Sequence, residues 1–107
     1  MKRYGMVIGI KAEKIAEYKK LHAEPWPEVL EILRRHHVTN YSIFLHDNRL
    51  FGYLEYHGTD FATDMKKIGE HEATKRWWQH TDPCQQPLDS RKPGEWWALM
   101  EEVFHMD

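Results

Sequence analysis

Apolar and polar residues alternate over four stretches of the chain, a pattern typical of β-strands whose two faces have different surroundings. These stretches are residues 3–10, 38–46, 50–57 and 96–106. In the first of them, Tyr4, Met6 and Ile8 share one side of the extended chain. The second and third stretches are separated by a short polar turn, so they are predicted to form a β-hairpin.

Between these strands the spacing of apolar residues lengthens to the period of an α-helix. Helices are expected over residues 11–22, from the Pro25-Trp26-Pro27 corner to about 37, from 61 past 68, and over 73–80. Pro27 suits the first turn of a helix, where its missing N–H costs little. Residues 82–95 are rich in Pro, Gln, Asp and Ser, so a long loop is expected there.

The predicted order of elements is β-α-(α)-β-β-α-(α)-β, without internal repeats. Four strands with helices on one face form an α+β fold of the ferredoxin-like βαββαβ type, here with extra helical segments and a four-stranded antiparallel sheet. Neither side of the last predicted strand is cleanly polar, since Trp97 and Leu99 lie on one side and Met100 and Phe104 on the other. We therefore expect a second subunit or an enclosed pocket on the sheet face that the helices leave open.

The composition narrows the class of protein. The chain has 107 residues, enough for one domain spanning 1–107. Its 15 Lys and Arg are balanced by 17 Asp and Glu, so the chain lacks the excess of positive charge expected of a nucleic-acid-binding protein. No apolar stretch is long enough to span a membrane. The single cysteine, Cys84, excludes an internal disulfide, and Met1-Lys2-Arg3 leads into a strand rather than an apolar signal region. These features predict a cytoplasmic protein.

The first candidate for chemistry is the pair Tyr18 and His22, which stand four residues apart on a predicted helix. Side chains at this spacing are neighbours, and the pair continues an apolar stripe from Ile15, so both point inward. Histidine titrates near neutral pH and can act as an acid and a base. The alternative is a histidine of the core that is hydrogen-bonded to the tyrosine.

The second candidate is the dipeptide Trp77-Trp78 on a later predicted helix. Adjacent helical residues point about 100° apart, so the two indoles cannot share one place in the core. One is expected to pack and the other to form a wall of a cavity, although both can be purely structural. His36-His37 and Glu70-His71-Glu72 lack the i, i+4 spacing that places two metal ligands on one helix face, so no metal is expected.

An ordered set of motifs resembles the L-rhamnose mutarotase family. The motifs are Glu17-Tyr18-Lys19-Lys20-Leu21-His22, Pro25-Trp26-Pro27-Glu28, Asn40-Tyr41-Ser42-Ile43-Phe44-Leu45, Arg76-Trp77-Trp78, Pro87 and Glu101-Glu102-Val103-Phe104. They run from the first predicted helix to the C-terminus in the family's order. Each motif is weak alone, but the ordered set is specific.

The resemblance implies a dimeric α+β barrel, hence a homodimer, that interconverts the anomers of L-rhamnose or a related 6-deoxy-hexose without cofactor or metal. It implies His22 as the acid/base residue, with Tyr18 beside it. It also implies that Tyr18, Tyr41, Trp77 and Trp78 contact the sugar. The chain departs from the best-known members at 85–88 and 94–97, which leaves the choice between L-rhamnose and a sugar such as L-fucose open.

Two other functions fit the same fold. One is a non-catalytic sugar-binding module, which needs the aromatic side chains but not His22. The other is a cofactor-free monooxygenase or a haem-degrading protein of the same barrel group, in which a histidine faces a large apolar cleft. The ordered motifs favour the mutarotase over both.

Overall fold

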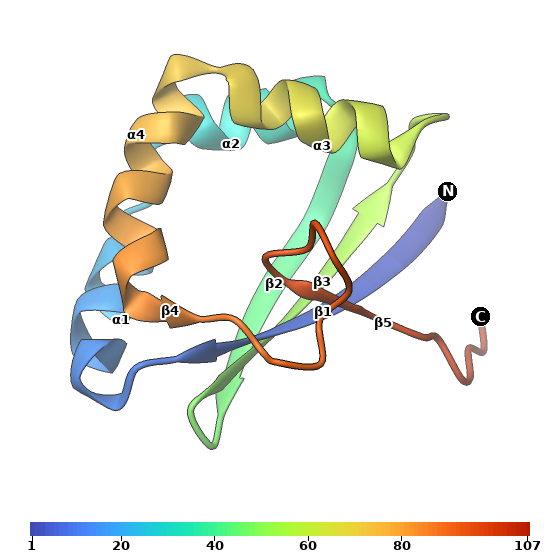
Figure 1. Cartoon of the computed structure of the whole chain (residues 1–107). Helices are drawn as coiled ribbons and strands as arrows, with labels where there is room; N and C mark the ends of the chain where they lie inside the picture. The colour runs from blue at the N-terminus through green and yellow to red at the C-terminus, as the bar shows by residue number, and fades with distance from the viewer.

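A curled antiparallel sheet forms the centre of the computed structural model, which describes residues 1–107 (Figure 1). Its long strands are β1 (Lys2–Ile10), β2 (Val38–His46) and β3 (Arg49–Tyr56). The strand order is β2-β3-β1-β4, with β5 also paired to β1. The α+β, ferredoxin-like class expected from the sequence is confirmed.

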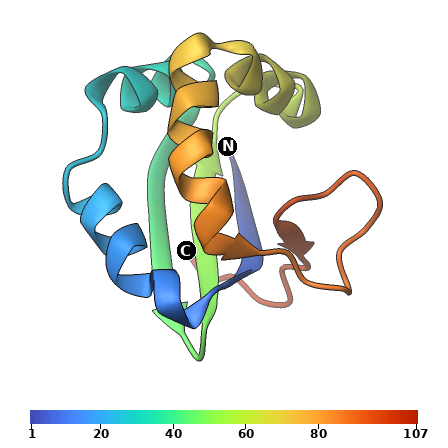
Figure 2. The same cartoon turned by 60° about the vertical axis from the view of Figure 1, so that its left-hand side comes forward.

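Two short strands, β4 and β5, stand where a single fourth strand was expected beside β1. β4 (Gln85–Gln86) pairs with Gly9 and Ile10, and β5 (Ala98–Met100) pairs with Gly5 to Val7 on the same edge of β1. Residues 87–97 leave the sheet between them, and in Figure 2 this excursion projects from the right-hand side of the molecule. The loop expected at 82–95 therefore contains a paired strand.

The C-terminal strand is much shorter than the predicted stretch 96–106. Only Ala98–Met100 pairs with β1, and residues 101–107 belong to no strand. Beyond Met100 the contact with β1 is made by side chains, where Arg3 Nε donates to Glu102 at 3.0 Å. Alternation predicts an extended chain, but a strand also needs a backbone partner.

The β2–β3 hairpin follows directly from the sequence of its turn. Asp47 and Asn48 connect the strands, and both have positive φ, at 51° and 59°. Such a pair of values belongs to the type I′ turn, whose twist matches that of the flanking strands. Asn and Asp adopt these angles more readily than other residues with side chains.

The helices cover one face of the sheet, and α4 crosses in front of the strands in Figure 2. They are η1 (Ala12–Lys14), α1 (Ile15–Ala23), α2 (Pro27–Arg35), α3 (Phe61–Glu70), α4 (Glu72–Thr81) and η2 (Asp82–Cys84). Pro27 is the first residue of α2, and the Asp60 side chain caps α3 by accepting from Thr63 N at 3.1 Å. No helix is long and apolar enough to cross a membrane.

Two clusters form the core between helices and sheet. One gathers Met6, Ile32, Val38, Leu54, Tyr56, Ile68 and Ala73, and the other gathers Ile8, Ile10, Tyr18, Leu50 and Cys84. Trp97 packs against both. Gly52 makes room for it, since a Cβ there would lie 3.0 Å from Met6 Cγ and 3.5 Å from Trp97 Cζ3.

The opposite face of the sheet is only partly covered. Phe44 is 64% exposed there, and in the C-terminal tail Phe104 is 79% exposed. Val103 and Met106 of the tail are also exposed.

Candidate active site

The first turns of the chain after β1 place Tyr18 and His22 on one side of α1. Their rings stack with centroids 4.2 Å apart. His22 Nδ1 lies 2.9 Å from the backbone oxygen of Tyr18. A carbonyl oxygen can only accept, so Nδ1 is the nitrogen that carries the proton in the neutral ring, and Nε2 is left with a free lone pair.

The protonation state of His22 follows from its surroundings. Burial lowers the pKa of the imidazole below its usual value, and the bond to the Tyr18 carbonyl opposes this shift. His22 is therefore neutral at pH 7. A neutral imidazole with one nitrogen bonded and the other free is ready to accept a proton.

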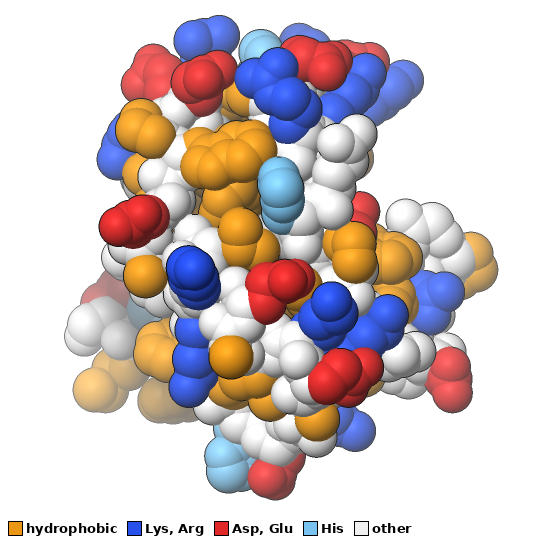
Figure 3. Space-filling model, turned by 90° about the vertical axis from the view of Figure 1, so that its left-hand side faces the viewer, with side chains coloured by type: hydrophobic (Ala, Val, Ile, Leu, Met, Phe, Trp, Pro, Cys, Tyr) orange, Lys and Arg blue, Asp and Glu red, His pale blue; other side chains and the backbone are white.

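Trp77 closes the site from α4. It is buried, and its ring meets His22 edge to face at 5.2 Å between centroids. On its other side it meets Trp26, again at 5.2 Å, and Trp26 meets His80. Figure 3 views this side of the molecule, where hydrophobic side chains form a patch beside a histidine.

Tyr41 reaches the same region from β2. The pairing of β2 with β3 is irregular between Thr39 and Ser42, and Asn40 has a φ of 47°. This bulge sets the direction of Tyr41, because an extra residue in a strand re-aims the side chains next to it. Tyr41 is 37% exposed, and burial raises the pKa of its phenol to about 12. Burial also raises the pKa of Tyr18, and the proximity of Tyr41 adds to that shift.

Trp78 lies on a different side of α4 from Trp77. It is 42% exposed and covers Gly69 of α3, where a Cβ would lie 2.9 Å from the indole Cη2. The structure thus brings Tyr18, His22, Tyr41 and Trp77 together and places Trp78 against α3. A sugar contact by Trp78 stays a prediction.

Gln85 and Trp96 adjoin the site, although neither was among the expected site residues. Gln85 is buried and its Nε2 donates to the Tyr18 hydroxyl at 3.2 Å. Its Oε1 accepts from Trp96 Nε1 at 2.7 Å. A glutamine in a polar segment is expected to be solvated, and only the pairing of β4 with β1 turns it inward.

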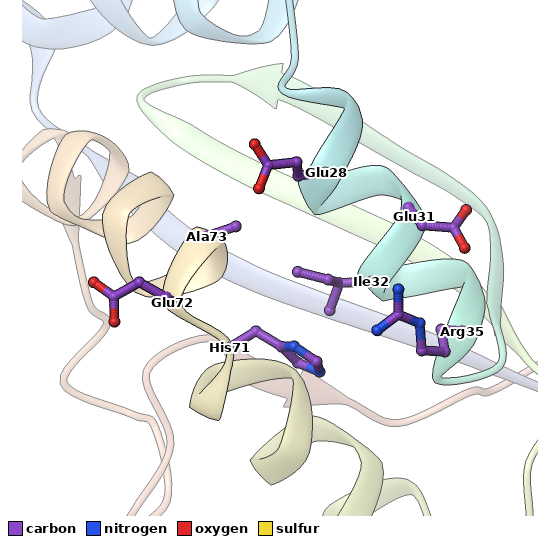
Figure 4. Close-up of a pocket in the computed structure, with 7 residues that line it drawn as sticks. All are labelled: Glu28, Glu31, Ile32, Arg35, His71, Glu72 and Ala73. Atoms are coloured by element: carbon purple, nitrogen blue, oxygen red, sulfur yellow. The ribbon is translucent and has the colours of Figure 1, made fainter.

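A separate pocket of about 290 Å³ opens between α2 and the start of α4 (Figure 4). Its lining residues are Glu28, Glu31, Ile32, Arg35, His71, Glu72 and Ala73. None of them is an expected site residue. The pocket offers charged groups but no indole or phenol face for the C–H bonds of a sugar, so it is not the candidate active site.

A model of the L-rhamnose mutarotase family matches residues 3–106. The chain belongs to this family. It is 36% identical to an L-rhamnose mutarotase of Oceanobacillus iheyensis and 37% identical to one of Lactiplantibacillus plantarum, with all of each chain covered. The resemblance stated from the sequence motifs is thereby confirmed.

One solved structure agrees with the family assignment, and a second shares the fold. The fold matches a crystal structure of an L-rhamnose mutarotase from Formosa agariphila with a TM-score of 0.77, at 26% identity and over all of both chains. Tetracenomycin F2 cyclase of Streptomyces glaucescens matches with a TM-score of 0.74 over 100% of this chain and 98% of the cyclase. At 13% identity the cyclase shares the fold alone.

Proposed function

We propose that this mutarotase-family protein interconverts the α and β anomers of L-rhamnose, with His22 carrying the proton. The observation that carries the proposal is the fixed tautomer of His22. Its Nδ1 is held by the Tyr18 carbonyl, and its Nε2 is free beside the rings of Tyr18 and Trp77. The family comparisons do not favour the alternatives, which are a sugar-binding module, a haem-degrading protein and a monooxygenase.

In the ring-opening step, His22 Nε2 accepts the proton of the anomeric hydroxyl. The C1–O1 bond becomes a carbonyl as the bond between C1 and the ring oxygen breaks. The imidazolium then gives its proton to the ring oxygen, which leaves a neutral open-chain aldehyde and a neutral histidine. Such general acid–base catalysis is worth about 10²–10⁴-fold.

Ring closure reverses these transfers after the aldehyde has turned about its C1–C2 bond. His22 takes the proton from the former ring oxygen, which attacks the other face of C1, and returns it to O1. Burial raises the pKa of the Tyr18 hydroxyl above its usual value, so this group stays protonated and stabilises a charged sugar oxygen as a hydrogen-bond donor. Tyr41 and Trp77 supply aromatic surface for the C–H bonds and the methyl group of the sugar.

The test is saturation-transfer NMR between the two anomeric protons of L-rhamnose. We expect exchange to be faster with the protein than without it, and the acceleration to disappear in His22→Ala. Acceleration with L-fucose but not with L-rhamnose would keep the reaction and change the substrate. If no sugar responds, the mutarotase proposal is wrong and the sugar-binding module takes its place.

We also propose that two copies associate through the open face of the sheet. Phe44 is exposed on β2, and Val103, Phe104 and Met106 are exposed in the tail that follows β5, so these apolar side chains are available to a second copy. Light scattering after size exclusion should give twice the monomer mass, and Phe44→Asp should shift it to the monomer. A wild-type monomer at micromolar concentration contradicts the proposal. Location in the cytoplasm remains a prediction.

A further inference from the structure

Gln85 links the site to the excursion 87–97 through a directed chain of hydrogen bonds. An indole N–H can only donate, so the Gln85 oxygen faces Trp96 and the Gln85 amide nitrogen faces Tyr18. The orientation of the amide is thus fixed by its two partners. Consequently the Tyr18 oxygen is the acceptor in its bond with Gln85.

This direction decides what the Tyr18 hydroxyl can do. A phenol has one proton to donate, and Gln85 does not use it. Burial raises the pKa of Tyr18, while the bond from Gln85 opposes the shift, so the phenol keeps its proton at neutral pH. The proton is then available to a partner other than Gln85, such as a sugar oxygen.

The backbone holds Gln85 firmly in this place. Gln85 pairs with Ile10 of β1, and the neighbouring Lys11 N donates to Cys84 O at 2.9 Å. Both Gln85 and Cys84 are buried. A side chain whose backbone and surroundings are fixed can orient a second group precisely.

We propose that Gln85 and Trp96 are positioning residues of the mutarotase site, because the chain from Trp96 through Gln85 to Tyr18 keeps the Tyr18 hydroxyl as a donor toward the sugar. The inference rests on the proposed function. Neither residue needs to touch the reacting atoms.

Gln85→Glu separates this role from simple packing. As an acid, the new side chain can still accept from Trp96 and donate to Tyr18. As a carboxylate it accepts from both and draws the Tyr18 proton away from the sugar. The titratable groups around Tyr18 are His22, which stacks on it, and Tyr41, Cys84 and Asp82, and the wild-type protein contains all of them.

We expect kcat of Gln85→Glu, divided by that of the wild type, to fall about five- to tenfold between pH 5 and pH 9. Division by the wild-type rate removes the titration of His22 where its ring chemical shifts titrate alike in both proteins, which NMR over the same pH range measures. The matched control is Gln86→Glu, because Gln86 is exposed and lies next to Gln85 in β4. The kcat of Gln86→Glu, divided by that of the wild type, should not change with pH.

Two further variants test the positioning role if Gln85→Glu does not fold. Gln85→Leu should lower kcat about five- to tenfold at every pH with less effect on KM, and Trp96→Phe should lower it about twofold or more. A pH-independent ratio for Gln85→Glu, or a wild-type kcat in Gln85→Leu or Trp96→Phe, overturns the proposal. An inactive wild-type protein instead overturns the proposed function, so the two failures are distinguishable.

Discussion

Two histidine–tyrosine clusters lie on the helix side of the sheet, and they differ in how many ring nitrogens are in use. In the first, His22 binds the Tyr18 carbonyl through Nδ1 and keeps Nε2 free. In the second, His36 uses both nitrogens, since Nδ1 lies 3.2 Å from Asp64 Oδ1 and Nε2 lies 3.0 Å from Nε2 of His71.

The second cluster is a closed network. Tyr56 donates to the other oxygen of Asp64, and the Tyr56 oxygen accepts from Asp60 N at 3.1 Å. The bonds from Tyr56 and from His36 hold the pKa of Asp64 below its usual value. Both ring nitrogens of His36 and both carboxylate oxygens of Asp64 have protein partners, which is typical of a structural network. The comparison teaches that the same residue types leave a ring nitrogen free in His22 and engage both nitrogens in His36.

The largest effect is expected from His22→Ala. This change removes the proton carrier, and the rate of anomer exchange should fall about 10²–10⁴-fold. The free energy of unfolding should change little, because the side chain is only half-buried and makes one hydrogen bond. NMR exchange rates and thermal unfolding measured on the same sample check both statements. Unchanged exchange contradicts the role of His22.

The next effect is expected from Tyr18→Phe. The ring still stacks on His22, but the sugar loses a buried hydrogen-bond donor and Gln85 loses its acceptor. We expect kcat to fall about ten- to hundredfold. Tyr53→Phe is the matched control, because this hydroxyl donates to Glu55 instead of facing the site. Equal rates in the two variants contradict a catalytic contribution from the Tyr18 hydroxyl.

His36→Ala should lower the stability of the protein and leave the rate of anomer exchange unchanged. Loss of the imidazole leaves Asp64 Oδ1 and His71 Nε2 each without a partner, and we expect the free energy of unfolding to fall by about 1–3 kcal/mol. The exchange rate of the folded fraction should stay at the wild-type level. Urea unfolding and NMR exchange below the unfolding transition measure the two quantities. A loss of exchange with unchanged stability would reverse the roles assigned to the clusters.

The sequence predicted those parts that depend on local patterns. The hairpin turn at Asp47-Asn48 and the stacked pair of Tyr18 and His22 follow from turn chemistry and from i, i+4 spacing. The angle between adjacent helical residues also predicted that Trp77 and Trp78 point to different places. Only the structure shows which of them faces His22 and which covers Gly69.

The remaining features depend on contacts between distant segments. The stretch 96–106 alternates, but pairing extends only over Ala98–Met100. Gln85 and Trp96 stand 11 residues apart in a segment predicted to be a loop, and β1 brings the first of them against Tyr18. The His36–His71 contact spans 35 residues of sequence. No local period encodes such partners, so they were absent from the prediction.

The smallest effect is expected from a change of pH. His22 in the first cluster and Asp64 in the second should respond in different pH ranges. Burial keeps the pKa of His22 below 6.5, so the neutral base persists to lower pH than a solvated imidazole. Between the folded pKa of His22 and the usual value of 6.5, the unfolded chain binds more protons than the folded one. Stability from His22 is therefore complete above pH 6.5 and declines as pH falls toward the folded value.

Asp64 behaves differently, because its folded pKa lies below the usual 3.8. Its contribution is present above that pH and is lost as pH falls through the folded value. On acidification kcat/KM should therefore decline while the Asp64 carboxylate is still ionised and bonded to Tyr56. Exchange rates and the carboxyl chemical shift of Asp64, followed from pH 8 to pH 3, measure the order of these events. Protonation of Asp64 before the loss of activity contradicts the assignment of a free base to His22 and of a bonded carboxylate to Asp64.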